Sequence, residues 1–299
     1  MSLRNEVFEK YEIAGKIARE VREEVGQLVH PGTSVIGICE KTEALIRQKG
    51  ARPAFPCNVS INHVAAHYTS PPNDRSIIPT KALVKVDIGV HLDGYIADTA
   101  ITVCSDPEYE NLVHASKEAL EVAVDTIVAD ISTAKLGRAI QKKIKSFGCK
   151  PVSNLTGHQI GRYLIHTGKS IPNVSHIVGS KIREGDIIAV EPFVTLDNAA
   201  GKVREGDIST IFRFVKRRSV KKASAMQLLR YIEENFKTLP FSERWLGSFP
   251  EKERRADFRD LLRSKCLMAY PIFVEASGKP VSQAEHTVLV TKEGCLVLT

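Results

Sequence analysis

The chain has 299 residues, of which 43% are hydrophobic and 26% charged, the composition of an ordinary globular protein. A chain of this length buries enough surface to form a core without a disulfide framework or a structural metal. No run of about 18 apolar residues, no signal-peptide pattern and no CxxC pair among the six cysteines is present. We therefore expect a cytoplasmic protein with no membrane segment.

The positive charge is concentrated in one segment. The chain carries 42 Lys and Arg against 35 Asp and Glu, a net charge of +7, and residues 216–265 alone hold 14 against 7. The other 249 residues therefore balance to zero. An acidic partner, if the protein has one, is expected to bind this segment.

Helical periodicity occurs in two pairs, each followed by strand-like runs. Predicted helices cover residues 3–28, 34–49, 105–129 and 132–147, with Thr33 or Ser34 as the second N-cap and Gly50 and Gly148 after the second and fourth helices. Predicted strands cover residues 83–90, 95–103, 187–195, 210–215, 269–275 and 285–290. This order is a loose duplication, and the Asp93-Gly94 turn favours antiparallel pairing, so the predicted class is α+β.

Residues 216–268 interrupt the strand pattern with helical periodicity and a turn-rich centre. We interpret them as a helical, basic insertion between two strands of a single domain spanning residues 1–299. Neither a G-x-G-x-x-G fingerprint nor a P-loop occurs, which argues against a nucleotide cofactor.

The strongest local signal is the segment from Val86 to Ala100. If Asp93-Gly94 forms a two-residue turn, Gly89 pairs with Asp98, and Asp87 and Asp98 share one face about 7–8 Å apart at the backbone. Two carboxylates among apolar residues repel each other, and a divalent metal would neutralise them. Gly89 would leave room for an ion or a substrate backbone. The alternative is a solvated hairpin with two surface aspartates.

Three more segments favour the metal. His158 and His166 lie eight residues apart in a glycine-punctuated stretch, Glu191 ends an apolar run, and Glu285 begins a C-terminal apolar strand. Two Asp, two Glu and one His suit two divalent ions that share carboxylates, an arrangement that serves hydrolysis. Because sulfur is absent from the set, Mn, Fe, Co and Zn are all admissible.

The motifs, taken in order, resemble those of the type II methionine aminopeptidases, in a short form without the charged N-terminal extension of longer members. They are Asn62-x-x-Ala65-Ala66-His67, Val86-Asp87-Ile88-Gly89 with Asp98, Gly157-His158 with Ile165-His166, Glu191-Pro192 and Glu285-His286-Thr287. The insertion at 216–268 matches the one that separates type II from type I. The resemblance covers nearly the whole chain.

The resemblance implies a pita-bread fold, in which two pseudo-symmetric halves with antiparallel sheets surround a dinuclear site. It implies that two divalent ions are held by Asp87, Asp98, His158, Glu191 and Glu285, with Asp98 and Glu285 bridging. By the same resemblance His67 and His166 face the substrate, and Tyr270 matches a tyrosine of the substrate pocket.

The implied activity is metal-dependent removal of the N-terminal methionine from nascent polypeptides, with a preference for a small second residue. Glu191 would shuttle a proton to the leaving amine, while His67 and His166 would hydrogen-bond the scissile amide. The basic insertion is then either a solvated face or a contact with ribosomal RNA near the peptide exit. We expect a monomer.

Two other functions stay open at this point. A proline-directed aminopeptidase or prolidase shares the fold but usually carries a large preceding domain, whereas about 50 residues precede the first motif here. A non-catalytic relative that binds RNA or protein would have lost ligands, and all five are present.

Overall fold

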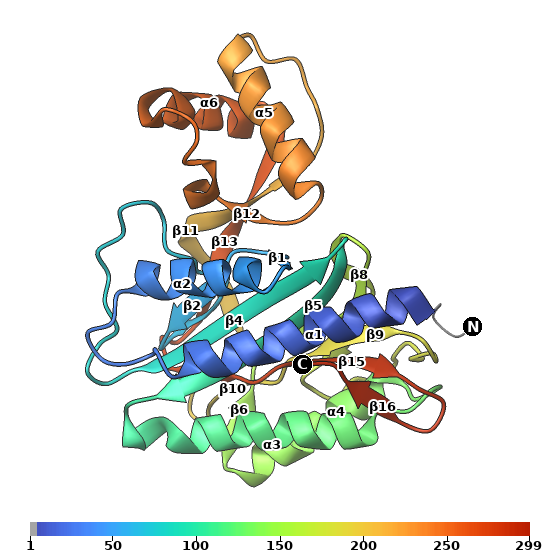
Figure 1. The fold of residues 1–299 in the computed structure, drawn as a ribbon. Helices are drawn as coiled ribbons and strands as arrows, with labels where there is room; N and C mark the ends of the chain where they lie inside the picture. Colours follow the sequence, from blue (N-terminus) through green and yellow to red (C-terminus); the bar gives the residue numbers. More distant parts are fainter. Residues whose placement is uncertain (1–4) are drawn as a thin grey trace.

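A computed structural model describes residues 5–299, which form six α-helices, two 3-10 turns and four antiparallel sheets (Figure 1). The predicted helix at 3–28 therefore begins with two residues outside the described part. The helices are α1 (Asn5–Gly26), α2 (Val35–Gln48), α3 (Glu110–Thr126), α4 (Thr133–Ser146), α5 (Ala223–Phe236) and α6 (Glu251–Arg263), with 3-10 turns η1 (Pro107–Tyr109) and η2 (Glu243–Leu246). The α+β class is confirmed.

The strands group into four sheets, and the strands of each sheet are named in their spatial order. The first has β1 (Arg52–Pro53), β4 (Leu83–Leu92) and β2 (Asn58–Ile61), with β5 (Tyr95–Cys104) also on β4. The second has β14 (Val281–Gln283), β10 (Phe193–Leu196) and β6 (Cys149–Pro151). The third has β12 (Phe241–Ser242), β11 (Val203–Phe214), β13 (Leu267–Glu275) and β3 (Val64–Ala66). The fourth has β16 (Cys295–Val297), β15 (His286–Val290), β9 (Ile187–Val190), β7 (Thr156–Gly161) and β8 (Leu164–Pro172).

Local sequence signals set the helix ends. The Ser34 side chain accepts a hydrogen bond from the Gly37 N–H and so caps α2, and Ser132 caps α4 in the same way through Ala134. Gly50 and Gly148 follow α2 and α4 with φ of 84° and 66°, the left-handed conformation that glycine adopts at helix ends. The two predicted glycine stops are therefore confirmed.

Each helix pair covers its own sheet and encloses its own core. Helix α1 packs along β4 and β5 and α2 against β1 and β2, and their apolar faces form one buried cluster. Helices α3 and α4 pack on each other and cover β10, β14, β6 and β8 around a second cluster. Figure 1 shows the two helix pairs outside and the strands between them. The loose duplication predicted from the sequence therefore corresponds to two helix-covered halves.

Several predicted boundaries were wrong for identifiable reasons. The predicted helix at 105–129 starts only at Glu110, because Asp106 caps the short turn η1, where Pro107 occupies the first position. The predicted strand at 187–195 is split into β9 and β10 around Glu191-Pro192, since proline cannot donate a ladder hydrogen bond. Strand β11 begins seven residues before the predicted Thr210, in a polar stretch that resembles a loop.

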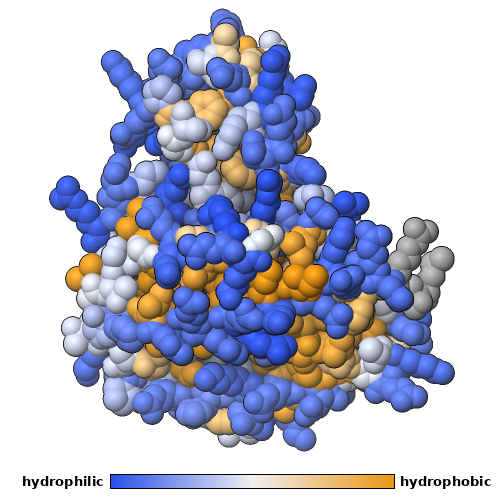
Figure 2. Space-filling model, in the orientation of Figure 1, coloured by the Kyte–Doolittle hydropathy of each residue, from blue (hydrophilic) through white to orange (hydrophobic). Residues whose placement is uncertain are grey.

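The segment between β11 and β13 forms a helical layer of its own. Helices α5 and α6 pack on each other and, with η2 and β12, enclose a third apolar cluster that includes Phe212, Phe241 and Phe258. The insertion was predicted to be helical, but it also contains strand β12, which pairs with β11. Figure 1 places α5 and α6 at the opposite end of the molecule from α3 and α4, and Figure 2 shows hydrophilic side chains around the rim of this end. No helix within residues 5–299 is long and apolar enough to cross a membrane.

His91, near the end of β4, is buried with 7% of its surface exposed. Its Nδ1 accepts a hydrogen bond from the Gly94 N–H of the hairpin turn, at 3.1 Å. Burial, together with the positive charges of Arg52 and Lys237, lowers the pKa of His91 to about 4. The folded protein therefore holds this imidazole neutral at a pH where the unfolded chain protonates it.

We expect the change from His91 to Asn to weaken the acid sensitivity of folding. A histidine with a folded pKa below its unfolded value of about 6.5 contributes stability above that value, and the contribution is lost as pH falls toward the folded pKa. Between pH 7 and 4.5 this amounts to about 2 kcal/mol for His91. Urea unfolding at pH 7 and pH 4.5 measures how much stability each protein loses on acidification, and His91→Asn should lose less than wild type by that amount. Equal losses in the two proteins would show that the pKa of His91 is not lowered by folding.

Candidate metal centre and substrate pocket

The β4–β5 hairpin places two aspartates on one face, as predicted. Asp93 and Gly94 occupy its two-residue turn with φ of 51° and 87°, the left-handed values that this turn requires. Gly89 pairs with Asp98, and Asp87 pairs with Ala100. Both carboxylates line the same pocket.

Gly89 plays a different role from the predicted one. A Cβ at this position would lie 2.3 Å from Cε1 of Phe55, so the phenyl ring already fills the space above the glycine. Phe55 itself lines the pocket. The missing side chain of Gly89 therefore makes room for an aromatic pocket wall and not for an ion or a substrate backbone.

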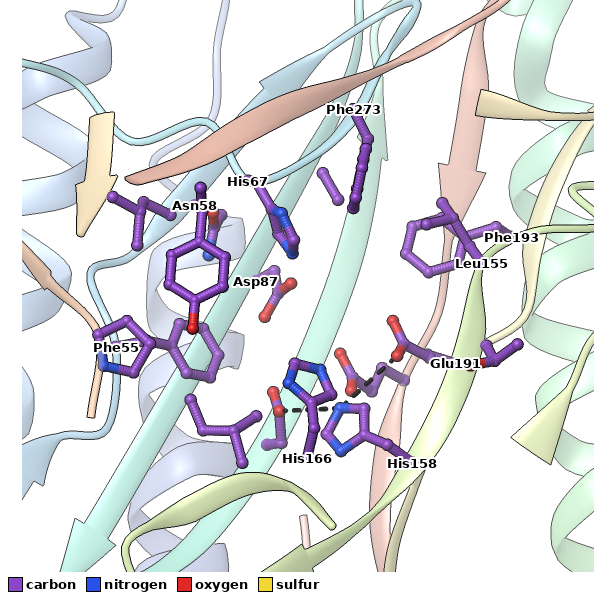
Figure 3. Close-up of a pocket in the computed structure, with 18 of the residues that line it drawn as sticks. Phe55, Asn58, His67, Asp87, Leu155, His158, His166, Glu191, Phe193 and Phe273 are labelled. Atoms are coloured by element: carbon purple, nitrogen blue, oxygen red, sulfur yellow. Dashed lines mark ion pairs between the residues drawn. The ribbon is translucent and has the colours of Figure 1, made fainter. Parts of the chain in front are cut away.

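The other predicted ligands converge on the aspartates from the neighbouring sheet. His158 lies in β7 beside Ala189 of β9, Glu191 directly follows β9, and Glu285 bridges to Ala100 of β5 just before β15. Asp98, His158 and Glu285 each offer one ligand atom within 4.8 Å of the others. The His158 Nε2 lies 3.7 Å from Asp98 Oδ2 and 3.6 Å from Glu191 Oε1, the pairs marked in Figure 3.

The four carboxylates repel one another in a buried space. Burial raises the pKa of Asp87 to about 7, and burial together with the neighbouring acids raises the pKa of Asp98, Glu191 and Glu285 well above their usual range. Burial, and then His166, lowers the pKa of His158 well below its usual value. A cation between these groups would reverse the repulsion.

The donor set fits divalent ions. Oδ1 of both aspartates and Nδ1 of His158 are buried without a hydrogen-bond partner. Carboxylate oxygens and a neutral imidazole are ligands that Mn, Fe, Co and Zn accept in proteins. Bound metal would satisfy the unpartnered aspartate oxygens, would bind the His158 Nε2 that faces the carboxylates, and would reverse the mutual repulsion.

Gln283 also belongs to the site, and the sequence reasoning missed it. Its side-chain Nε2 donates to Glu191 Oε2 at 3.3 Å and to Glu285 Oε2 at 3.2 Å, and the residue is 1% exposed. The one available signal was its position in β14, two residues before Glu285. One amide group therefore links two of the four carboxylates.

We expect Gln283→Leu to weaken divalent-metal binding by about 10- to 100-fold, the usual effect of losing an outer partner of a metal ligand. Isothermal titration of the metal-stripped protein with Mn²⁺ measures the affinity. Gln159→Leu is the matched control, because Gln159 also donates to a carboxylate, Asp186, at 3.0 Å but does not line the pocket. Equal affinities of the two variants would show that Gln283 does not orient the ligands.

Two further histidines stand beside the cluster. His67 follows β3 with a φ of 65°, and its ring centroid lies 4.7 Å from that of Phe273 and 5.9 Å from that of Tyr270. His166, from β8, lines the pocket, with its ring 4.2 Å from that of His158. Burial, and then the charge of His166, lowers the pKa of His67 to about 4, and burial lowers the pKa of His166 as well.

The pocket that joins these groups encloses about 480 Å³. Its walls are partly aromatic and aliphatic, and Figure 3 shows Phe55, Phe193, Leu155 and Phe273 around the polar centre. Thr238 and Pro240 of the insertion contribute one side. The eight predicted site residues, which are Asp87, Asp98, His158, Glu191, Glu285, His67, His166 and Tyr270, all line this one cavity.

The sequence matches the metallopeptidase family M24 over residues 9–292. It is 43% identical to a methionine aminopeptidase of Methanothermobacter thermautotrophicus over 297 residues, which are 98% of this chain and 99% of the relative. It is 42% identical to a methionine aminopeptidase of Saccharolobus solfataricus over 291 residues, 96% of both chains.

Solved structures agree on the fold. The structure of a thermophilic Arx1 matches with a TM-score of 0.86 at 22% identity, covering 99% of this chain and 91% of that one. A methionine aminopeptidase of Thermotoga maritima matches with a TM-score of 0.70 at 21% identity, covering 99% and 98%. A prolidase of Pyrococcus furiosus matches with a TM-score of 0.63 at 18% identity, but only 64% of its chain is covered. The fold of these structures is the predicted pita-bread fold.

Proposed function

The chain belongs to metallopeptidase family M24, and from this premise we propose how its pocket removes the N-terminal methionine from proteins and peptides. The protein is a hydrolase that depends on divalent metal, as the family and the full-length likeness to methionine aminopeptidases establish. The observation that carries the proposal is the convergence of Asp98, His158 and Glu285 at the head of one cavity. Residues 1–299 would act as one catalytic domain, with 216–268 as an insertion.

Asp87, Asp98, His158, Glu191 and Glu285 would hold two divalent ions, with Asp98 and Glu285 bridging. This set is supported by the unpartnered buried oxygens and by the clustered carboxylates, whose charge two dications would balance. Co, Mn, Fe and Zn are the candidate ions. When bound, such ions polarise the scissile carbonyl and lower the pKa of water toward neutrality.

Glu191 would move the proton of the reaction. Its carboxylate faces His158 Nε2 on one side and Gln283 on the other, at the side of the cluster. In this role it takes the proton of the attacking water and delivers it to the leaving amine. Gln283, which donates to Glu191 Oε2, would keep the carboxylate oriented during both transfers.

His67 and His166 would bind the scissile amide. Their lowered pKa values keep both imidazoles neutral at neutral pH, so each can donate one hydrogen bond and accept another. The His67 Nδ1 is buried without a partner, as a group reserved for substrate would be. Donation to the scissile carbonyl stabilises the charge that develops on its oxygen.

The aromatic and aliphatic walls would receive the methionine side chain, with Tyr270 beside His67 as part of the pocket. The same cavity, of about 480 Å³, would also hold the start of the following chain, and we propose that it prefers Gly, Ala or Ser as the second residue.

The test is release of free methionine from a Met-Gly-Met peptide by metal-stripped protein to which Mn, Co, Fe or Zn is added back. We expect no release without metal and restored release with at least one ion. Cleavage of an Xaa-Pro peptide in place of Met-Gly-Met would favour the proline-directed activity. Cleavage of neither peptide with any ion would contradict the proposed function.

We also propose that the basic insertion contacts ribosomal RNA near the peptide exit, where a monomeric cytoplasmic enzyme would meet nascent chains. Lys216, Arg217, Arg218, Lys221 and Lys222 are exposed before and at the start of α5. All six cysteines are free thiols, which suits a reducing compartment.

Co-sedimentation with purified ribosomes tests this contact. Because binding of Lys and Arg to phosphates releases counterions, association should be lost as salt rises. Changing Lys216, Arg217 and Arg218 to Ala should abolish association at low salt. The matched control changes the exposed Lys135, Lys142 and Lys145 of α4 to Ala, which removes the same charge from the opposite end of the molecule. Equal association of the two variants would contradict the proposal.

A further inference from the structure

Arg213 brings a positive charge into the substrate pocket. It lies in β11, where Ile211 pairs with Tyr270 and Arg213 with Met268 of β13. Ile211 and Arg213 share one face of the strand and both line the pocket, whereas Phe212 between them belongs to the core of the insertion. The alternation of the strand therefore directs the guanidinium into the cavity.

The Arg213 guanidinium has no counter-ion within the described residues 5–299. No carboxylate in that range forms an ion pair with it, and its Nε is buried without a hydrogen-bond partner. By contrast, Arg244 is held by both oxygens of Glu43. The Arg213 charge lowers the pKa of His166 after the larger effect of burial. The Arg213 charge and its side-chain hydrogen bond with Tyr270, a neutral partner, also partly oppose the rise that burial causes in the pKa of Tyr270.

Among the described residues that line the cavity, Arg213 is also the only Arg or Lys. The four acidic residues of the lining are Asp87, Asp98, Glu191 and Glu285, which are the proposed metal ligands. Their charge would be balanced by metal, so none of them is available to Arg213. An unpaired charge that is partly removed from water is costly unless a ligand supplies the partner.

The position of Arg213 suits a ligand that extends from the metal cluster toward solvent. Asp98 and Glu285 are 3% and 2% exposed, whereas Arg213 is only partly buried. A peptide whose amino end and scissile bond lie at the cluster must leave the cavity toward its open side. Its residues after the scissile bond then pass the more exposed wall to which Arg213 belongs.

We propose that Arg213 binds a carboxylate of the peptide substrate beyond the scissile bond, and so favours peptides that carry a carboxylate there. The planar guanidinium can pair with a carboxylate through two parallel hydrogen bonds. The carboxylate can come from an acidic side chain after the second residue or from the C-terminus of a short peptide. This inference rests on the proposed function, because it assumes that the cavity binds N-terminal methionine peptides.

The test compares kcat/KM for methionine release from two pairs of peptides by the metal-loaded enzyme. Met-Ala-Glu-Ala-amide against Met-Ala-Gln-Ala-amide measures recognition of a side chain, and Met-Ala-Ala against Met-Ala-Ala-amide measures recognition of a C-terminus. We expect a preference for the carboxylate of about tenfold in at least one pair, the lower range for a hydrogen bond to a charged group. The pair that shows the preference identifies the source of the carboxylate.

Arg213→Met should bring that ratio to about one, and Arg213→Lys should leave an intermediate ratio, because the charge remains but the paired geometry is lost. The control is Arg204→Met, which removes an exposed arginine of the same strand and should keep the wild-type ratio. Equal ratios in wild type and Arg213→Met, with methionine released from the neutral peptides, would overturn this inference alone. No methionine release from any peptide by wild type would overturn the proposed function and this inference with it.

Discussion

Changing Asp98 to Asn should reduce methionine release by at least about 100-fold. Loss of an outer partner of a metal ligand already costs up to about 100-fold, and Asp98 is proposed to be a ligand itself. Asp98 is 3% exposed, faces His158 Nε2 and shares its ligand region with Glu285. An amide in its place removes one negative charge and one anionic oxygen from the position proposed to bridge two ions. We expect weaker metal binding and slower chemistry together, which a metal titration and a methionine-release assay measure separately.

The same variant should be more stable than wild type when both are free of metal. The pKa of Asp98 is raised well above its usual range, first by burial and then by the charge of Asp87, so the metal-free fold carries an unfavourable cluster of acids. The neutral amide of Asp98→Asn would relieve that repulsion, and the metal-free melting temperature should rise. Loss of activity with a gain in metal-free stability cannot be attributed to misfolding.

Asp93→Asn is the matched control for this pair of measurements. Asp93 lies in the turn of the same β4–β5 hairpin, is exposed, and pairs with Lys10 at 2.8 Å outside the cavity. Exposed pairs contribute about 0–1 kcal/mol, so this variant should keep its activity, its metal affinity and nearly all its stability. Wild-type activity of Asp98→Asn would contradict the assignment of Asp98 as a metal ligand.

The hairpin could be predicted from the sequence because its signals are local. The turn residues Asp93 and Gly94 fix the pairing, and the two-residue period of a strand then fixes which side chains share a face. Asp87 and Asp98 could therefore be placed together from the sequence alone. His158, Glu191 and Glu285 come from segments far away in the sequence, so residue type alone could suggest them as ligands, and the resemblance to a family was needed to join them to the aspartates.

Gln283 and the role of Gly89 could not be predicted for a different reason. Each depends on a neighbour that lies far away in the sequence, since Gln283 bonds to Glu191 and Gly89 accommodates Phe55. A neutral amide in a strand carries no pattern that separates a structural role from a ligand-orienting one. Arg213 was missed because a single arginine in an alternating strand resembles any solvent-facing residue.

Changing Arg244 to Met should lower the free energy of unfolding by about 3–5 kcal/mol, the range for breaking a buried ion pair by removing one partner. Arg244 donates to both carboxylate oxygens of Glu43 at 2.9 and 2.8 Å, and the two side chains are 4% and 3% exposed. Without the guanidinium, Glu43 would keep a buried charge with fewer donors. This contact joins η2 of the insertion to α2 of the first half of the molecule.

Arg255→Met provides the matched control within the same insertion. Arg255 pairs with Glu251 at 2.6 Å one turn apart on α6, and the side chains are 58% and 56% exposed. Such helix-surface pairs contribute about 0.3–0.5 kcal/mol. Urea unfolding followed by far-ultraviolet circular dichroism should therefore separate the two variants by several-fold in the loss of stability, and equal losses would contradict the importance of burial.

The double variant Glu43→Met with Arg244→Met should recover part of the loss, because it removes the unpaired charge as well as its partner. Recovery will be incomplete, since the Trp245 Nε1 donates to Glu43 at 2.6 Å and the Cys57 N–H donates to it at 3.3 Å. Both donors would be left unsatisfied by the apolar replacement. Since Thr238 and Pro240 of the insertion line the pocket, loosening this contact should also raise KM for methionine peptides more than it lowers kcat. A double variant no more stable than Arg244→Met would show that the hydrogen bonds of Glu43, and not its unpaired charge, account for the loss.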